Sequence, residues 1–169
     1  MKRMDFTILV VDDSKDDLAL IVAAFHQMDV RQKMQTCDCG SEAIDYLTGA
    51  GKFADRELFP YPAFLITDLK MPKGDGFSIL QHILNTPEYK IIPTLVYSAS
   101  ADPADIQIAY DLGASSYLVK PNDYGQTRKL FRTVYDYWLQ CEKPEVDGAG
   151  RRVQTYIRGK IGEKYMHGS

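Results

Sequence analysis

The sequence predicts an α/β protein in which five parallel strands form one doubly wound sheet with helices on both faces. Short continuous apolar runs, such as residues 6–11 and 63–67, alternate along the chain with stretches whose apolar residues recur at helical spacing. Continuous apolar runs are typical of strands buried on both faces, as in a parallel sheet. Five such alternations indicate one domain over residues 5–141.

The first four predicted elements occupy residues 6–47. A strand over residues 6–11 leads through Ser14, a good helix N-cap, into an amphipathic helix. Its apolar residues recur at i, i+3, i+4 and i+7, namely Leu18, Ile21, Val22 and Phe25. Residues 33–37 are expected to form a second strand and residues 41–47 a short second helix. Residues 49–62 are rich in Gly, Pro and charge, which indicates an unusually long loop.

The second half of the chain continues this alternation. A strand over residues 63–67, a turn at 71–76 and a helix with Phe77, Leu80, Ile83 and Leu84 on its apolar side come first. A fourth strand at 91–97 and a helix at 103–112, capped by Asp102 and ended by Gly113, follow. A short strand at 117–119 precedes a long helix at 123–141. The predicted apolar face of that helix carries Leu130, Val134, Tyr137, Trp138 and Cys141.

Polar side chains stand at the carboxyl ends of the predicted strands, namely Asp12, Asp13, Asp68, Ser98 and Lys120. In an open parallel sheet these ends meet at one edge, where ligands bind. Three carboxylates brought together need a cation, and all-oxygen ligation suits Mg²⁺. A carboxylate can attack phosphorus, while a lysine and a hydroxyl group can hold the transferred oxygens. The set predicts a phosphoryl-accepting site, although each residue alone is equally typical of a helix cap or a surface group.

Four segments resemble the receiver-domain signatures of response regulators in two-component signalling, in the order and at the spacing of that family. They are Val-Val-Asp-Asp-Ser (10–14), Thr-Asp-Leu-Lys-Met-Pro-Lys-Gly-Asp-Gly (67–76), Tyr-Ser-Ala-Ser (97–100) and Gly-Ala-Ser-Ser-Tyr-Leu-Val-Lys-Pro (113–121). The resemblance covers residues 5–141. It implies a flavodoxin-like, chemotaxis-regulator-like (βα)5 fold with strand order 2-1-3-4-5.

The resemblance also implies which residues bind the phosphoryl group and the metal ion. Asp68 would be the phosphoacceptor, and Mg²⁺ (or Mn²⁺) would be the cofactor. The ion would be held directly by Asp13, Asp68 and the main-chain carbonyl of Lys70. Asp12 would reach it largely through water.

The remaining matched residues would respond to the phosphoryl group. Lys120 would pair with its oxygens, and a cis peptide is expected before Pro121. Added charge needs a bistable element to be read elsewhere. Ser98 would move in to donate a hydrogen bond to the phosphoryl group, and Tyr117 would follow into the vacated space. Ala99 is small enough to leave room for this entry.

The expected output is protein contact, because no complete DNA-binding or enzymatic domain follows residue 141. The expected partners are a sensor histidine kinase, a phosphotransfer protein or a downstream target. A homodimer through the last helix is a further expectation, if Tyr117, Phe131 and Tyr135 are partly exposed. The loop at 49–62 and Tyr-Asp-Tyr-Trp-Leu at 135–139 resemble the single-domain regulators that partner phytochrome-type kinases.

Two other classes of protein remain open from the residues. An aspartyl-phosphate phosphatase or phosphotransferase of the haloacid-dehalogenase type would carry an early Asp-x-Asp motif, whereas Asp12 is followed directly by Asp13. A flavin-binding protein would need a Gly-rich and hydroxyl-rich first loop, where this chain has two carboxylates. The sequence therefore favours a phosphoacceptor switch that is not an enzyme.

Composition fits a protein that binds neither nucleic acid nor membrane. The 169 residues carry a net charge of −3, and no apolar run reaches the length of a membrane span. Three cysteines, with Cys37 and Cys39 two residues apart, predict core thiols rather than disulfides or a metal site. A cytoplasmic location is expected. Residues 142–169 are expected to form a tail, a linker followed by a mobile terminus or a short basic helix.

Overall fold

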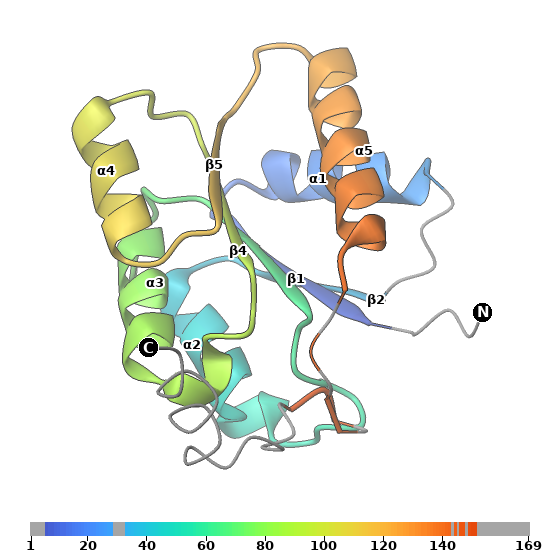
Figure 1. The fold of residues 1–169 in the computed structure, drawn as a ribbon, viewed down its shortest axis with the longest axis vertical. Helices are drawn as coiled ribbons and strands as arrows, with labels where there is room; N and C mark the ends of the chain where they lie inside the picture. The colour runs from blue at the N-terminus through green and yellow to red at the C-terminus, as the bar shows by residue number, and fades with distance from the viewer. Residues whose placement is uncertain (1–5, 29–32, 143, 145, 148, 152–169) are drawn as a thin grey trace, which may run out of the picture.

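The computed structural model describes residues 6–28, 33–142, 144, 146, 147 and 149–151, and these form the predicted α/β architecture. Five strands lie in one sheet in the order β2-β1-β3-β4-β5, and every neighbouring pair is parallel (Figure 1). Their bounds are β1 Thr7–Val11, β2 Lys33–Cys37, β3 Phe64–Thr67, β4 Thr94–Ser98 and β5 Ser116–Val119. The predicted fold class and strand order are confirmed.

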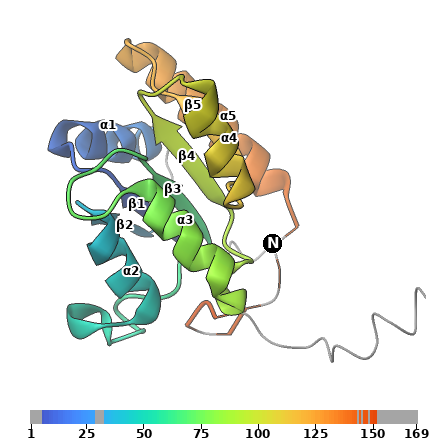
Figure 2. The ribbon, with the colours of Figure 1, turned by 90° about the vertical axis from the view of Figure 1, so that its left-hand side faces the viewer.

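Within the described residues, five α-helices cover the two faces of this sheet. They are α1 Lys15–His26, α2 Gly40–Thr48, α3 Gly76–Asn85, α4 Pro103–Asp111 and α5 Tyr124–Gln140. Helices α1 and α5 pack on one face and α2, α3 and α4 on the other, as the two views in Figures 1 and 2 show. The described part of the chain contains no helix with the length and apolarity needed to span a bilayer.

Strand β1 shows why the apolar runs are continuous. Successive side chains of a strand point to opposite faces of the sheet. Ile8 and Val10 pack with residues of α1 and α5, whereas Leu9 and Val11 pack with residues of α2 and α3. All five residues of β1 are therefore buried, and the run needs no polar alternation.

The predicted helix starts are confirmed by their caps. Ser14 Oγ accepts a hydrogen bond from the main-chain N–H of Asp17 at 3.2 Å, and Asp102 Oδ1 accepts one from Ala104 at 2.9 Å. These bonds satisfy N–H groups that have no partner inside the helix. The caps place the first turns of α1 and α4 directly after the carboxyl ends of β1 and β4.

Two side chains of α5 lie on the opposite side from the one predicted. Phe131 is 0% exposed and packs against Phe25 and Tyr97, so it is core rather than part of an exposed surface. Tyr137, predicted on the apolar face, is 70% exposed. The apolar residues of this helix spread over more than one stripe, which makes its inner face ambiguous in the sequence.

Two local expectations are also wrong. The described residues contain no cis peptide, so the bond before Pro121 is trans, the form that an X–Pro bond favours by about 0.5–1 kcal/mol. Strand β4 begins at Thr94 rather than at residue 91. A 3₁₀ turn at Pro87–Tyr89 and Pro93, which lacks an N–H, delay entry into the sheet.

The predicted long loop at 49–62 is ordered by aromatic packing. It contains a 3₁₀ turn at Gly51–Phe53, and the rings of Tyr46, Phe53 and Phe59 meet edge to face with centroids 5.1–6.2 Å apart. Arg56 donates hydrogen bonds to the main-chain carbonyls of Tyr46 and Leu47 at the end of α2. The loop is therefore attached to the body of the domain.

Part of the predicted tail returns to this loop. The main-chain N–H of Tyr61 donates a hydrogen bond to the carbonyl of Ala149 at 2.8 Å. Asp147 holds the turn that precedes the contact, because its Oδ1 accepts hydrogen bonds from the N–H groups of Ala149 and Arg151. Residues 152–169, where the mobile terminus or short basic helix is predicted, lie outside the described residues.

Candidate functional site

Three carboxylates meet at the carboxyl edge of the sheet, as the sequence predicts. Val11 pairs with Thr67 in register, so Asp12 and Asp68 follow adjacent strands at the same level. Carboxylate oxygens of Asp12, Asp13 and Asp68 lie within 4.8 Å of one another. Asp12 and Asp68 are buried, while Asp13 is exposed. The cluster therefore has a dry inner side and an opening to solvent.

Lys120, which directly follows β5, supplies the positive charge of this cluster. Its Nζ lies 2.6 Å from Asp12 Oδ2, 2.7 Å from Asp17 Oδ2 and 2.8 Å from Asp68 Oδ2. Burial lowers the pKa of this ammonium group, but the hydrogen bonds to Asp12, Asp17 and Asp68 outweigh burial and raise the pKa above its usual value. Lys120 is therefore a fixed cation.

One ammonium group does not satisfy Asp12 completely. Burial raises the pKa of Asp12 above 3.8, and hydrogen bonds from Lys120 and from the N–H of Ser14 only partly oppose this effect. Several carboxylates around a single ammonium leave negative charge in excess, and all the side-chain donors are oxygens. Such a set fits a hard divalent cation, Mg²⁺ above all.

Both carboxylate oxygens of Asp68 accept a hydrogen bond. Its Oδ1 accepts a hydrogen bond from the N–H of Leu69 at 2.6 Å, and its Oδ2 faces Lys120. The following turn closes tightly: the N–H of Gly76 donates to the carbonyl of Leu69 at 2.8 Å. A Cβ at Gly76 would lie 2.1 Å from the main-chain oxygen of Asp68, so this position requires glycine.

The predicted metal ligand on this turn is the main-chain carbonyl of Lys70. Within the residues that the structure describes, this carbonyl accepts no hydrogen bond, whereas that of the preceding Leu69 is used by Gly76. The side chain of Lys70 turns to α4, where its Nζ pairs with Asp105 Oδ2 at 2.8 Å. The main-chain oxygen is therefore available to an ion.

The two predicted switch residues lie on adjacent strands. Ser98 is buried at the end of β4, and its Oγ accepts a weak hydrogen bond from the N–H of Ser100 at 3.4 Å. Tyr117 of β5 pairs with Val96 of β4, and its hydroxyl donates to the carbonyl of Ser100 at 2.8 Å. Both side chains thus bond the same segment between β4 and α4.

Sequence reasoning missed two carboxylates that join this network. Asp17 contacts Lys120, and Asp105 accepts hydrogen bonds from Ser100 Oγ at 2.5 Å and from Lys70. Each lies three residues after its helix cap, Ser14 or Asp102. Acidic residues are common in the first turn of a helix because of the helix dipole, so this spacing alone does not distinguish a site residue.

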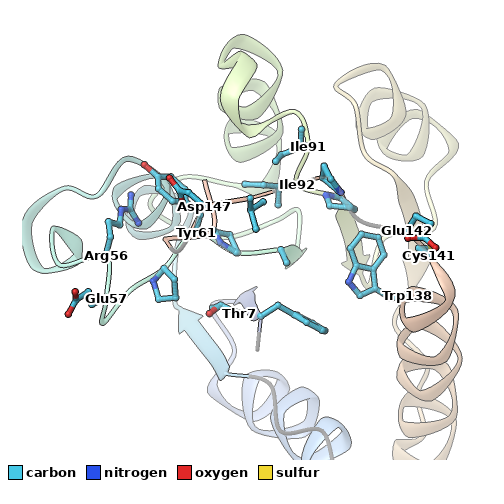
Figure 3. A pocket seen from close by; sticks show the side chains of 18 residues that line it. Thr7, Arg56, Glu57, Tyr61, Ile91, Ile92, Trp138, Cys141, Glu142 and Asp147 are labelled. Carbon is cyan, nitrogen blue, oxygen red and sulfur yellow. The ribbon is translucent and has the colours of Figure 1, made fainter. Parts of the chain in front are cut away.

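A cavity of about 750 Å³ lies at the opposite edge of the sheet. Thr7 at the start of β1, Tyr61 and Ile92 in the loops before β3 and β4, and Trp138 of α5 surround it in Figure 3. Its described lining is mostly apolar and takes no residue from the carboxylate cluster. The cavity and the cluster are therefore separate features.

Comparison with known proteins identifies the family. Residues 8–132 match the response regulator receiver domain. The chain is 29% identical to Response regulator Rcp1 of Synechocystis, over 79% of this chain and 88% of that protein. It is also 29% identical to the probable methanogenesis regulatory protein FilR2 of Methanothrix harundinacea, over 79% of this chain and 84% of that protein.

Solved structures agree with this result. The phosphorylated cyanobacterial phytochrome response regulator RcpA superposes with a TM-score of 0.78 and 31% identity, covering 84% of this chain and all of RcpA. The Mn²⁺-bound form of Rcp1 superposes with a TM-score of 0.75 and 28% identity, covering 83% of this chain and 99% of Rcp1. The chain belongs to the response regulator receiver domain family.

Proposed function

We propose that this chain is a phosphoacceptor switch in which Asp68 receives a phosphoryl group from a histidine kinase. The observation that carries the proposal is the environment of Asp68. One carboxylate oxygen is oriented by a main-chain N–H, the other faces the ammonium of Lys120, and two further carboxylates lie within reach of a shared cation. This arrangement combines a nucleophile with groups that neutralise a transferred phosphoryl group.

The cofactor of this acidic site is Mg²⁺ or Mn²⁺. Asp13, Asp68 and the main-chain carbonyl of Lys70 would hold the ion directly, and Asp12 through water. The ion neutralises phosphoryl oxygens and shields the carboxylates from one another. A bound Mn²⁺ in the similar Rcp1 structure supports this assignment.

Besides the cofactor ion and the phosphohistidine donor, the transfer uses three groups of this chain, from Asp68, Leu69 and Lys120. A carboxylate oxygen of Asp68 attacks phosphorus of the donor phosphohistidine, and an O–P bond forms while the N–P bond breaks. The imidazole leaves with the electron pair. The hydrogen bond from the N–H of Leu69 keeps the carboxylate oriented, and Lys120 neutralises the incoming oxygens.

The signal leaves the site through Ser98 and Tyr117. A phosphoryl group on Asp68 attracts the hydroxyl of Ser98, whose Oγ accepts a weak hydrogen bond from the N–H of Ser100 at 3.4 Å. The ring of Tyr117 then follows. Its hydrogen bond to the carbonyl of Ser100 is broken or remade in the process, so the segment before α4 changes with it.

A sensor kinase is the upstream partner of this receiver domain. The similarity to RcpA and Rcp1 supports a kinase of the phytochrome type. Downstream we propose a phosphotransfer protein or a protein target, with no nucleic acid or membrane partner. A homodimer through α5 is supported by Tyr137 and Leu139, which are exposed, rather than by Phe131.

The domain limits and the location in the cell belong to the same proposal. Residues 5–141 form the receiver domain, and residues 142–169 are a tail. The cytoplasmic location stays a prediction from the sequence. A non-enzymatic switch is preferred to an aspartyl-phosphate phosphatase, because Asp12-Asp13 follows β1 without the Asp-x-Asp spacing.

Uptake of radiolabelled phosphate from acetyl phosphate with Mg²⁺ tests the proposal. The wild type is expected to take up label, and Asp68→Asn is expected to take up none. Asp45→Asn, which removes an exposed carboxylate on α2, serves as the matched control and should label like the wild type. Label on Asp68→Asn at the wild-type level would show that another residue is the acceptor.

A further inference from the structure

Asp17 is the third carboxylate around Lys120, and it lies outside both the metal cluster and the matched signature segments. Its Oδ2 is 2.7 Å from Lys120 Nζ, between the 2.6 Å to Asp12 and the 2.8 Å to Asp68. An ammonium group has three N–H donors, so the three carboxylates use all of them. Lys120 is thus shared between two carboxylates that belong to the cluster and one that does not.

The start of α1 holds Asp17 in this position. The main-chain N–H of Asp17 donates to Ser14 Oγ, and Ser14 in turn donates its N–H to Asp12. The backbone between the two carboxylates is therefore fixed at both ends. The Asp17 side chain is 32% exposed and that of Lys120 is 13% exposed, so the pair is better shielded than an ordinary surface ion pair.

A divalent ion would not affect the three ion pairs of Lys120 equally. An ion held directly by Asp13 and Asp68, and by Asp12 through water, would attract two of the three carboxylates that pair with the ammonium, and it would repel the ammonium itself. Asp17 lies outside that cluster, so its contact with Lys120 does not involve a ligand of the ion. It is the one of the three acceptors that does not compete with the ion.

We propose that Asp17 is a positioning residue, which holds the ammonium of Lys120 beside Asp68 while a metal ion occupies the acidic cluster. The inference rests on the proposed function and adds to it. Lys120 is already in place when the phosphoryl oxygens arrive, so its reorientation does not slow the transfer. Without Asp17, the ammonium moves out of the site when the ion enters.

Hydrogen exchange of the Lys120 ammonium group tests this directly, without any phosphorylation. In protein with isotope-labelled lysine, NMR signals of the Lys120 ammonium are identified by their loss in Lys120→Met. In the wild type these hydrogens stay protected from exchange when Mg²⁺ is added to saturation. In Asp17→Asn they lose protection on addition of Mg²⁺. Protection that persists in Asp17→Asn overturns the proposal.

The matched control is Asp16→Asn. Asp16 is exposed in the same first turn of α1 and makes no ion pair within the described residues, so its replacement removes the same charge without touching Lys120. Asp16→Asn should keep the protection of the wild type. Equal loss in both variants attributes the effect to charge at the helix start and overturns the proposal.

Phosphorylation by acetyl phosphate at saturating Mg²⁺ provides the second readout. Asp17→Asn should slow the reaction about fivefold, the size expected for one partly exposed charge-assisted hydrogen bond. Asp17→Glu should recover most of the rate. In a Lys120→Met background, Asp17→Asn should change nothing further, because it acts through Lys120.

The outcomes separate this inference from the proposed function. A wild type that takes up no label removes the function and this inference with it. A wild type that takes up label, together with an Asp17→Asn variant as fast as Asp16→Asn, overturns the inference alone. An equal slowing by Asp17→Asn in the Lys120→Met background also overturns it, since Asp17 then acts without Lys120.

Discussion

Lys120 carries one positive charge among three carboxylates, and its loss has a cost that depends on pH and on metal. In Lys120→Met the buried Asp12 and Asp68 lose the ammonium group that pairs with both of them. The variant is expected to lose about 3 kcal/mol of unfolding free energy at pH 7 without metal. Urea denaturation measures this loss, and Lys129→Met at an exposed position of α5 is the matched control.

The same comparison has a defined pH dependence. The pKa of Lys120 is raised in the folded protein above its ordinary value of 10.5. Its contribution to stability is therefore complete below pH 10.5 and is lost as pH rises through the folded value. The difference in unfolding free energy between wild type and Lys120→Met should be constant from neutral pH up to pH 10.5 and shrink above it. A gap that widens there would contradict the ion pairs.

Replacement of Asp12 should change the stability of the metal-free protein in the opposite direction to replacement of Lys120. Burial raises its pKa above 3.8, so the ionised form costs stability at pH 7 in metal-free protein. Asp12→Asn is expected to raise the unfolding free energy without metal, by on the order of 1 kcal/mol or a few degrees in Tm. It should also reduce the stabilisation by Mg²⁺. Calorimetry with and without Mg²⁺ measures both effects. A lower Tm for Asp12→Asn than for the wild type in metal-free protein would contradict this prediction.

Among the residues of the site, the sequence predicted those that follow strands but not those that lie on helices. Asp12, Asp13 and Asp68 follow apolar runs, so the edge on which they meet is readable from the pattern. Asp17 and Asp105 lie one turn into a helix, where acidic residues are common for helix-dipole reasons alone. Only the folded structure, in which Lys120 contacts Asp17 and Lys70 contacts Asp105, shows that these two acidic residues belong to the site's network.

Among the elements, the turn from β3 to α3 depends on a close backbone contact at Gly76. A Cβ there would lie 2.1 Å from the main-chain oxygen of Asp68. Gly76→Ala is expected to cost about 3 kcal/mol of unfolding free energy and to disturb Asp68. Gly51→Ala is the control, because φ is +55° but the space is open, and about 1 kcal/mol is expected. Equal costs would show that the contact can relax.

Strand β5 and the segment before α4 are the elements expected to move. Beryllofluoride with Mg²⁺ mimics the phosphoryl group, and it should shift the fluorine NMR signal of Tyr117 in protein with fluorinated tyrosine. Tyr117→Phe identifies that signal among the eleven tyrosines. Tyr89, which is buried in the core cluster beneath α2 and α3 and away from the acidic site, is the internal control. A Tyr117 signal that stays in place would exclude the proposed switch.

Element boundaries show what a local pattern predicts and what it leaves open. The predicted strand at 63–67 agrees with β3 to one residue, because buried β-branched and aromatic residues are bounded by proline and Asp68. Residues 91–93 are just as apolar as β4, yet they stay outside the sheet behind a 3₁₀ turn. Periodicity over three residues is too short to separate these cases.

For the whole molecule, the predicted homodimer concerns the exposed side of α5. Sedimentation with beryllofluoride and Mg²⁺ is expected to show a larger dimer fraction than without it. Tyr137→Glu should weaken that dimer about tenfold, because an exposed aromatic at an interface is often a main contact. Gln126→Glu, exposed at the other end of α5, is the matched control. Equal dimerisation of both variants would place the interface elsewhere.

The topology of the whole chain was predictable because five alternating segments leave few arrangements, and short right-handed crossovers restrict them further. The position of Ala149 beside Tyr61 was not, because the hydrogen bond between them and the turn at Asp147 leave no periodic signal. Long-range contacts of this kind depend on the folded surface rather than on local sequence.

Direct mapping of the modified residue tests the central claim most closely. Wild-type protein is treated with acetyl phosphate and Mg²⁺, digested at low pH and analysed by mass spectrometry. The account predicts one phosphorylated peptide, with the group on Asp68, removed by hydroxylamine as an acyl phosphate. Phosphate found on a serine, a histidine or another aspartate, with Asp68 unmodified, would contradict it.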